Sequence, residues 1–145
     1  MPLSRRALPF DHPEWIFELK YDGFRSLAVM QNGRTQLISR NGHPFNSFSE
    51  LSKSLMHSAG KTVLDGEIVC LDKRGRPQFR DLLFHRGEPC FYAFDLLMCD
   101  GKDLRSERLT DRKHADWASH IKTAVRRPHR AARYGVISAC VRDGS

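Results

Sequence analysis

Apolar and polar residues alternate along several short stretches of the chain, with the period of two that is typical of β-strands. The stretch of residues 89–99 is the most apolar one, and it is expected at the centre of a sheet. Tight turns separate most of these stretches, which favours antiparallel neighbours. Strands are therefore predicted at residues 15–21, 24–31, 34–40, 62–71 and 89–99.

Three dipeptides mark the turns. Asn32-Gly33 lies between two alternating stretches and predicts a hairpin with a type I′ turn. Asn41-Gly42 and Asp100-Gly101 predict further turns. Strands joined in this way, with few helices between them, predict an α+β fold: a mainly antiparallel sheet with short flanking helices.

Helical signals are short. Ser47 and Glu50 fit a capping box, with Leu51 and Leu55 on one face of the helix that follows and Gly60 as its stop. One or two helical turns are expected within residues 78–85, and residues 109–125 can form a helix with few apolar positions.

Composition narrows the class of protein. The 145 residues match the size of one domain, and 40% of them are hydrophobic. No apolar run approaches the length of a membrane-spanning helix, and the first residues lack the apolar region of a secretory signal. The four cysteines show neither a C-x-x-C pair nor metal-ligand spacing, so reduced thiols and a cytoplasmic location without membrane contact are expected.

Charge is distributed unevenly. The formal net charge is +7, yet residues 1–100 hold 13 Lys and Arg against 12 Asp and Glu, whereas residues 101–145 hold 11 against 5. A basic segment attracts nucleic acid through its phosphates. One hypothesis is therefore a nucleic-acid-binding module that acts through its C-terminal third.

Lys20 is the strongest candidate for chemistry. Alternation through residues 15–21 places Glu18 and Lys20 on one face of the strand, and Asp22-Gly23 and Arg25 follow directly. A lysine must lose its proton to act as a nucleophile, and its ordinary pKa is about 10.4. A neighbouring carboxylate raises this pKa, so a divalent metal and a partly dry pocket would have to outweigh Glu18.

Four motifs, in order, resemble those of covalent nucleotidyltransferases. Residues 20–25 fit the K-x-D-G-x-R signature, residues 39–42 an S-R-N-G element, residues 65–67 the Asp-Gly-Glu of a third motif, and residues 91–97 the strand that packs on the base. Together they cover residues 10–113 and are most similar to the adenylation domain of bacterial ATP-dependent DNA ligases of the end-joining type. RNA ligases and capping enzymes share the lysine signature and remain alternatives.

The resemblance implies a fold, cofactors and roles. The fold would be part of a nucleotidyltransferase domain (ATP-grasp-like), ATP and Mg²⁺ the cofactors, and nicked double-stranded DNA the partner. Lys20 would carry AMP as a phosphoramidate and pass it to the 5′-phosphate of the nick. Nucleotide binding would fall to Glu18 near the adenine, Arg25 at the ribose or nick, Arg40 at a phosphate, Glu67 at the ribose hydroxyl or the metal, and Phe94 stacked on adenine. Asp65 and Asp95 are assigned no chemistry.

The chain departs from the family beyond Asp116. The later E-G-x-x-x-K and K-x-K motifs are missing from the sequence, and another chain is one source for them. The domain organisation expected is an extended lead-in at 1–13, a partial adenylation domain at 14–113 and a basic, poorly ordered tail at 114–145. Truncation or a change of reading frame near residues 114–126 is one hypothesis, and a catalytically inactive remnant or a nucleotide- or DNA-binding fragment is the alternative function.

Overall fold

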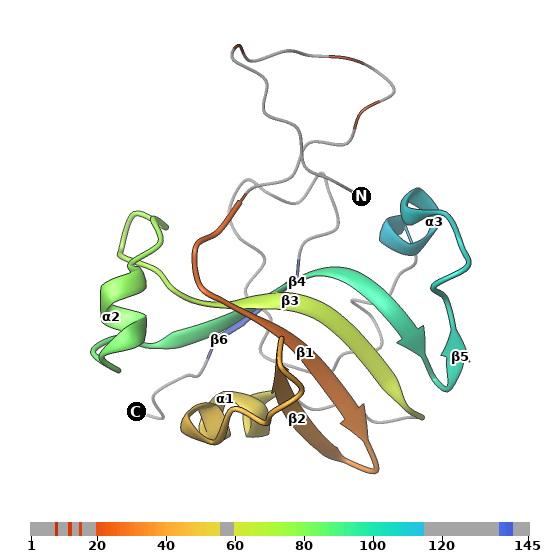
Figure 1. Cartoon of the computed structure of the whole chain (residues 1–145), viewed down its shortest axis with the longest axis horizontal. Coiled ribbons are helices and arrows are strands. Elements are labelled where there is room, and N and C mark those ends of the chain that lie inside the picture. Colours follow the sequence, from red (N-terminus) through yellow and green to blue (C-terminus); the bar gives the residue numbers. More distant parts are fainter. Residues whose placement is uncertain are drawn as a thin grey trace.

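An antiparallel sheet forms the body of the protein (Figure 1). The computed structural model describes Leu8, His12, Trp15, residues 20–55 and 60–114, and the backbone of residues 137–140. Within these residues the strand order is β2-β1-β3-β4-β5, and β6 pairs with β4. The elements are β1 (Phe24–Gln31), β2 (Arg34–Ser39), η1 (Asn46–Phe48), α1 (Ser49–Ser54), β3 (Thr62–Cys70), α2 (Phe79–Leu83), β4 (Pro89–Cys99), β5 (Lys102–Asp103), α3 (Leu109–His114) and β6 (Ile137–Cys140).

The predicted strands after residue 23 are confirmed. β1 and β4 have the predicted bounds, and β2 and β3 each end one residue early. The β1–β2 hairpin turns at Asn32 and Gly33, whose φ angles of 53° and 70° are the positive values that a type I′ turn requires. The antiparallel sheet with short helices was therefore readable from the alternation and the turn residues.

One face of the sheet carries the core. Alternate residues of β1 and β3 are buried there, among them Ala28, Met30, Leu64 and Ile68. Leu51 of α1 and Leu82 of α2 pack onto the same cluster, together with residues of β4. Both helices consequently cover this face. The other face carries a smaller buried cluster of Val69, Cys90 and Tyr92, and its remaining residues are half-exposed.

The helix predictions are partly wrong. The Ser47–Glu50 capping box is absent: Ser47 lies inside η1, and α1 begins at Ser49 without a side-chain cap. This helix ends at Ser54 instead of reaching Gly60, because Leu55 takes an extended ψ of 87°. Leu51 and Leu55 are nevertheless buried as predicted, so packing rather than capping holds the helix.

Other differences lie near the chain ends. Lys20 and Tyr21 are not part of a strand, although residues 15–21 were predicted as one, and residues 16–19 lie outside the described part. The predicted helix at 109–125 is α3 as far as His114, and its remainder also lies outside. β6 was missed, because residues 126 onward show no clear period.

The sheet has irregular pairing in β4. Ala93 lies opposite Gly66 of β3 and Asp95 lies opposite Asp65, so Phe94 has no counterpart in the register. A Cβ atom on Gly66 would stand 2.4 Å from the carbonyl oxygen of Tyr92, which only a glycine avoids. This bulge lies within two of the motifs that carry the resemblance.

The cysteines differ in their oxidation state. Cys70 and Cys99 are free thiols, as predicted, whereas Cys90 is disulfide-bonded, which corrects the expectation of four reduced cysteines. Among the described residues, no helix is long and apolar enough to cross a membrane.

Candidate functional site

Lys20 lies just before β1, in the segment that leads into the sheet. Its amine is bonded to the carboxylate of Asp22, and its side chain is 84% exposed. The hydrogen bond and charge of Asp22 raise the pKa of Lys20, and the more distant charge of Glu67 adds to this. The amine is therefore protonated at neutral pH, and the partly dry pocket that would lower its pKa is not formed around it by the described residues.

Gly23 brings this segment against β3. A Cβ atom here would stand 2.0 Å from the carbonyl oxygen of Ile68, so a larger residue would push the chain away. The backbone N–H of Gly23 donates a hydrogen bond to the carboxylate of Glu67. Two backbone constraints thus fix the distance between Glu67 and the residues that follow Lys20.

Glu67 lies on the face of β3 opposite to the core, and it pairs in register with Arg25 of β1. Partial burial raises the pKa of Glu67, while the charges of Arg25 and Lys20 and the hydrogen bond from Gly23 oppose the rise. The carboxylate is therefore an electrostatic neighbour of both cations. It is available to a ligand that brings its own hydroxyl group or metal ion.

Arg25 connects Glu67 with Phe94. Its guanidinium donates two hydrogen bonds to Asp65, from Nε to Oδ1 and from Nη2 to Oδ2, both 2.6 Å long. The Cζ atom of Arg25 also lies 4.3 Å from the centre of the Phe94 ring. A fork bound to a carboxylate and resting on an aromatic face has little freedom, so Arg25 holds the ring and the acid in one place.

Of the two remaining predicted residues, one makes no contact with this cluster and one lies outside the described part of the chain. Arg40 is exposed in the turn after β2, and within the described residues its side chain forms no ion pair or hydrogen bond. Glu18 lies outside the described residues. The structure therefore places Arg25 beside both Glu67 and Phe94, and Lys20 within electrostatic reach of Glu67, whereas Arg40 makes no contact with them among the described side chains.

Sequence reasoning missed three participants. Asp65 and Asp95 were assigned no chemistry, yet Asp65 holds Arg25, and Asp95 holds Arg112 of α3 at 2.8 Å. Arg112 received no role, because a single arginine in a basic segment gives no sign of its partner. Asp65 could have been found from its place beside Gly66 and Glu67 in the third motif.

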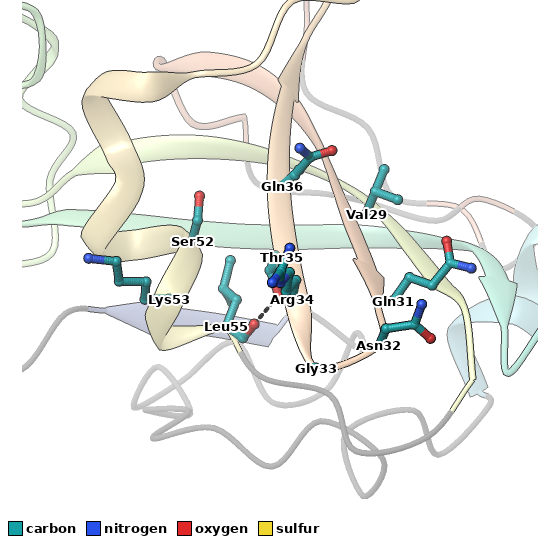
Figure 2. A pocket seen from close by; sticks show the side chains of 10 residues that line it. All are labelled: Val29, Gln31, Asn32, Gly33, Arg34, Thr35, Gln36, Ser52, Lys53 and Leu55. Atoms are coloured by element: carbon teal, nitrogen blue, oxygen red, sulfur yellow. Dashed lines mark hydrogen bonds between the residues drawn. The ribbon is translucent and has the colours of Figure 1, made fainter.

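Two grooves lined by described residues lie apart from Arg25 and Phe94. Figure 2 shows the larger one, a groove of about 810 Å³ between the β1–β2 hairpin and α1, where Thr35 bonds the carbonyl oxygen of Leu55. A second groove of about 480 Å³ lies between α1 and the α2–β4 connection, lined by Phe48 and His85 among others. Neither of these two grooves includes Lys20 or Glu67.

The residues present suit the two cofactors in different degrees. The described residues contain no group of three or more acidic, histidine or cysteine side chains able to enclose a metal ion. Mg²⁺, however, commonly takes one carboxylate from the protein and its other ligands from phosphates and water, which Glu67 alone can satisfy. The ring of Phe94 and the cations of Lys20 and Arg25 suit the base and the phosphates of a nucleotide.

Comparisons with known proteins agree with this chemistry. The family described as "ATP dependent DNA ligase domain" matches residues 5–115. The multifunctional non-homologous end joining protein LigD of Pseudomonas aeruginosa is 40% identical over 107 residues, which cover 69% of this chain and 13% of that protein. The Bacillus subtilis bifunctional LigD is 33% identical over 121 residues, covering 69% of this chain and 20% of that protein.

Solved structures give the same answer for the fold. A mycobacterial DNA ligase D complexed with ATP and MES superimposes with a TM-score of 0.61 and 28% identity, covering 87% of this chain and 48% of that chain. The ligase domain of Mycobacterium tuberculosis LigD gives a TM-score of 0.56 and 30% identity, covering 72% and 36%.

The chain belongs to the ATP-dependent DNA ligase domain family. It is homologous to the ligase domain of LigD-type end-joining proteins and covers only part of that domain. The resemblance that the motifs predicted is thereby confirmed, and the sheet has the fold of a ligase adenylation domain.

Proposed function

We propose that this chain performs the adenylation step of an ATP-dependent DNA ligase that acts on nicked double-stranded DNA, with Lys20 as the nucleophile. The observation that supports the proposal is that residues of three separate motifs are neighbours: Arg25 pairs in register with Glu67 and lies on the ring of Phe94, and the charge of Glu67 acts on Lys20. The three motifs are far apart in the sequence, yet they contribute a guanidinium, an acid and a partly exposed ring to one face of the sheet.

The step proceeds at the amine of Lys20. The neutral nitrogen attacks the α-phosphorus of ATP, a nitrogen–phosphorus bond forms, and the bond to pyrophosphate breaks. The Lys20 ammonium must first release one proton to solvent, against the stabilising charge of Asp22, and a second proton leaves the nitrogen as the new bond forms, with Asp22 beside it. The nick's 5′-phosphate then takes AMP from Lys20, and the amine regains a proton.

The other residues bind and orient. Arg25 neutralises phosphate charge at the ribose or nick, Phe94 stacks on adenine, and Glu67 holds the ribose hydroxyl or Mg²⁺, which supplies charge neutralisation when bound. Arg40 meets a phosphate, and Glu18 meets the adenine. Residues 14–113 form this partial domain in a cytoplasmic repair protein, and residues 114–145 are a basic extension.

Weak self-adenylation is expected, because the Lys20 amine must first lose the proton that Asp22 stabilises. A second candidate function, nucleotide binding without turnover, is favoured by one observation: the exposed Lys20 amine is held protonated by Asp22.

Mass spectrometry of the full chain after incubation with ATP and Mg²⁺ separates the two. The adenylation proposal expects one added AMP that is lost in acid and kept in base, and no adduct on Lys20→Ala. Lys53→Ala is the matched control, because Lys53 is also an exposed, carboxylate-paired lysine. Equal labelling of Lys20→Ala would refute the nucleophile, and binding of ATP without an adduct would establish the second candidate.

A further inference from the structure

Two neighbouring residues of α3 hold two neighbouring residues of β4. Arg112 donates from Nε and Nη2 to the two oxygens of Asp95, both at 2.8 Å, and from Nη1 to the carbonyl oxygen of Glu107 at 2.7 Å. Lys113 donates from Nζ to the carbonyl oxygen of Phe94 at 2.8 Å. The side chains of Arg112 and Asp95 are only 13% and 16% exposed, so this pair is well shielded from solvent.

Phe94 needs such support because the sheet does not supply it. Asp95 and Ala93 are in register with β3, but Phe94 lies in the bulge between them. A bulge residue loses the regular ladder bonds that fix a strand residue's orientation. The bond from Lys113 takes over part of this role, and the Arg112–Asp95 pair fixes the residue that follows Phe94.

The charges of this surface alternate. Asp65 and Asp95 are directly opposite one another on β3 and β4, an arrangement that is unfavourable for two carboxylates. Arg25 neutralises Asp65, and Arg112 neutralises Asp95. Without Arg112, the uncompensated Asp95 would compete with Asp65 for Arg25, whose guanidinium rests on the Phe94 ring.

We propose that Arg112 and Asp95 are positioning residues for Phe94. Helix α3 fixes the ring in two ways: through its bonds to the β4 bulge, and through the row of alternating charges formed by Arg25, Asp65, Asp95 and Arg112. If the ring stacks on the adenine base, as the proposed function holds, Arg112 acts on nucleotide affinity from outside the nucleotide's reach. Its effect then passes entirely through Phe94.

The first test needs no nucleotide. NMR spectra of the full chain would follow the Phe94 ring signals and the Arg25 Nε–H signal in Arg112→Gln and in Arg112→Lys, which keeps the charge but loses the fork. Both signals are expected to shift, more in Arg112→Gln. Arg105→Gln is the matched control, because Arg105 forms a similar fork with Asp103 on the exposed surface. Unchanged Phe94 and Arg25 signals in a folded Arg112→Lys would overturn the proposal.

The second test measures coupling. Arg112→Gln is expected to raise the ATP concentration for half-maximal self-adenylation rate by about five- to tenfold, with a smaller change in the rate at saturating ATP, and by less than about twofold when Phe94→Leu is already present. An equal rise in both backgrounds would show that Arg112 acts on general stability and would overturn the positioning role. Absence of ATP binding by the unsubstituted chain would refute the proposed function alone, since the NMR comparison still decides whether Arg112 positions the ring.

Discussion

The two faces of this sheet are built from the same strands and are held by different forces. On one face, residues such as Ile68 and Phe91 are almost fully buried beneath α1 and α2. On the other, Val69 and Tyr92 form a smaller buried cluster, whereas Arg25, Glu67 and Phe94 remain partly exposed and are arranged by ion pairs, a backbone hydrogen bond and a ring contact. Successive residues of a strand point to opposite faces, so a single strand such as β3 contributes to both.

This difference separates stability from chemistry. Apolar burial contributes in proportion to the area removed from water, and it tolerates few changes in shape. Exposed ion pairs contribute little to stability, although they fix the position of polar groups. Substitutions on the core face are therefore expected to unfold the chain, and those of the partly exposed polar residues on the other face to change its binding or its titration.

Phe91 and Phe94 give the sharpest contrast, because they are three residues apart on β4. Phe91→Ala is expected to lower the free energy of unfolding by about 3–5 kcal/mol, since it leaves a cavity in the core. Phe94→Ala is expected to cost about 1 kcal/mol, mainly through the lost contact with Arg25. Urea unfolding followed by circular dichroism measures both, and similar losses would contradict the division between the faces.

Gly23 lets the segment that follows Lys20 approach β3 closely. Gly23→Ala is expected to cost about 1–3 kcal/mol, because its new methyl group would overlap the carbonyl oxygen of Ile68. Self-adenylation at Lys20 should be lost in the same variant. Gly75→Ala is the control: its methyl group meets open space, although the φ of 77° strains it, so labelling by ATP should persist. Normal labelling of Gly23→Ala would show that this close approach does not place Lys20.

Glu67 is expected to reduce stability. Its pKa is raised by burial, so the folded chain holds this proton more tightly than the unfolded chain does. Stability therefore falls as pH rises past the ordinary pKa of 4.5 toward the raised value, and Glu67→Gln should gain less than about 1 kcal/mol at pH 7. The gain should vanish near pH 3, where both states are protonated.

Urea unfolding at pH 7 and at pH 3 provides the measurement for Glu67→Gln. Glu50→Gln, on the surface of α1, is the control. A loss of stability in Glu67→Gln at pH 7 would mean that Glu67 contributes to the fold rather than weakening it.

Asp22→Asn should have the smallest effect. Removing this carboxylate is expected to lower the pKa of Lys20, which NMR of ¹³C-methylated lysines can follow. Because the pKa of Lys20 is raised in the folded chain, Lys20 contributes stability below its unfolded pKa of 10.5, and this contribution is lost as pH rises through the folded pKa. Asp22→Asn should therefore also weaken this pH dependence of the free energy of unfolding. Asp72→Asn, which removes an acid bonded to Arg76, should leave the Lys20 titration unchanged.

Much of the fold was readable because its signals are local. Alternation fixed β1, β3 and β4, and the Asn32–Gly33 turn fixed the hairpin. The predicted N-cap of α1 was wrong because Ser47 was assigned from a four-residue pattern alone. The packing of Leu51 and Leu55 in the core decides where that helix lies. The sequence did not predict β6, because a short strand that pairs with β4 can form without an alternating pattern of apolar and polar residues.

The sequence by itself determined the family and the strands from β1 to β4, because motif spacing and period-two alternation are properties of the chain alone. Only the tertiary structure decided which charges meet: Arg25 with Asp65 and Arg112 with Asp95, across 40 and 17 residues. It also decided that Lys20 rests exposed beside Asp22. Partners far apart in the chain become neighbours only when strands pair in register, and no local pattern records that distance.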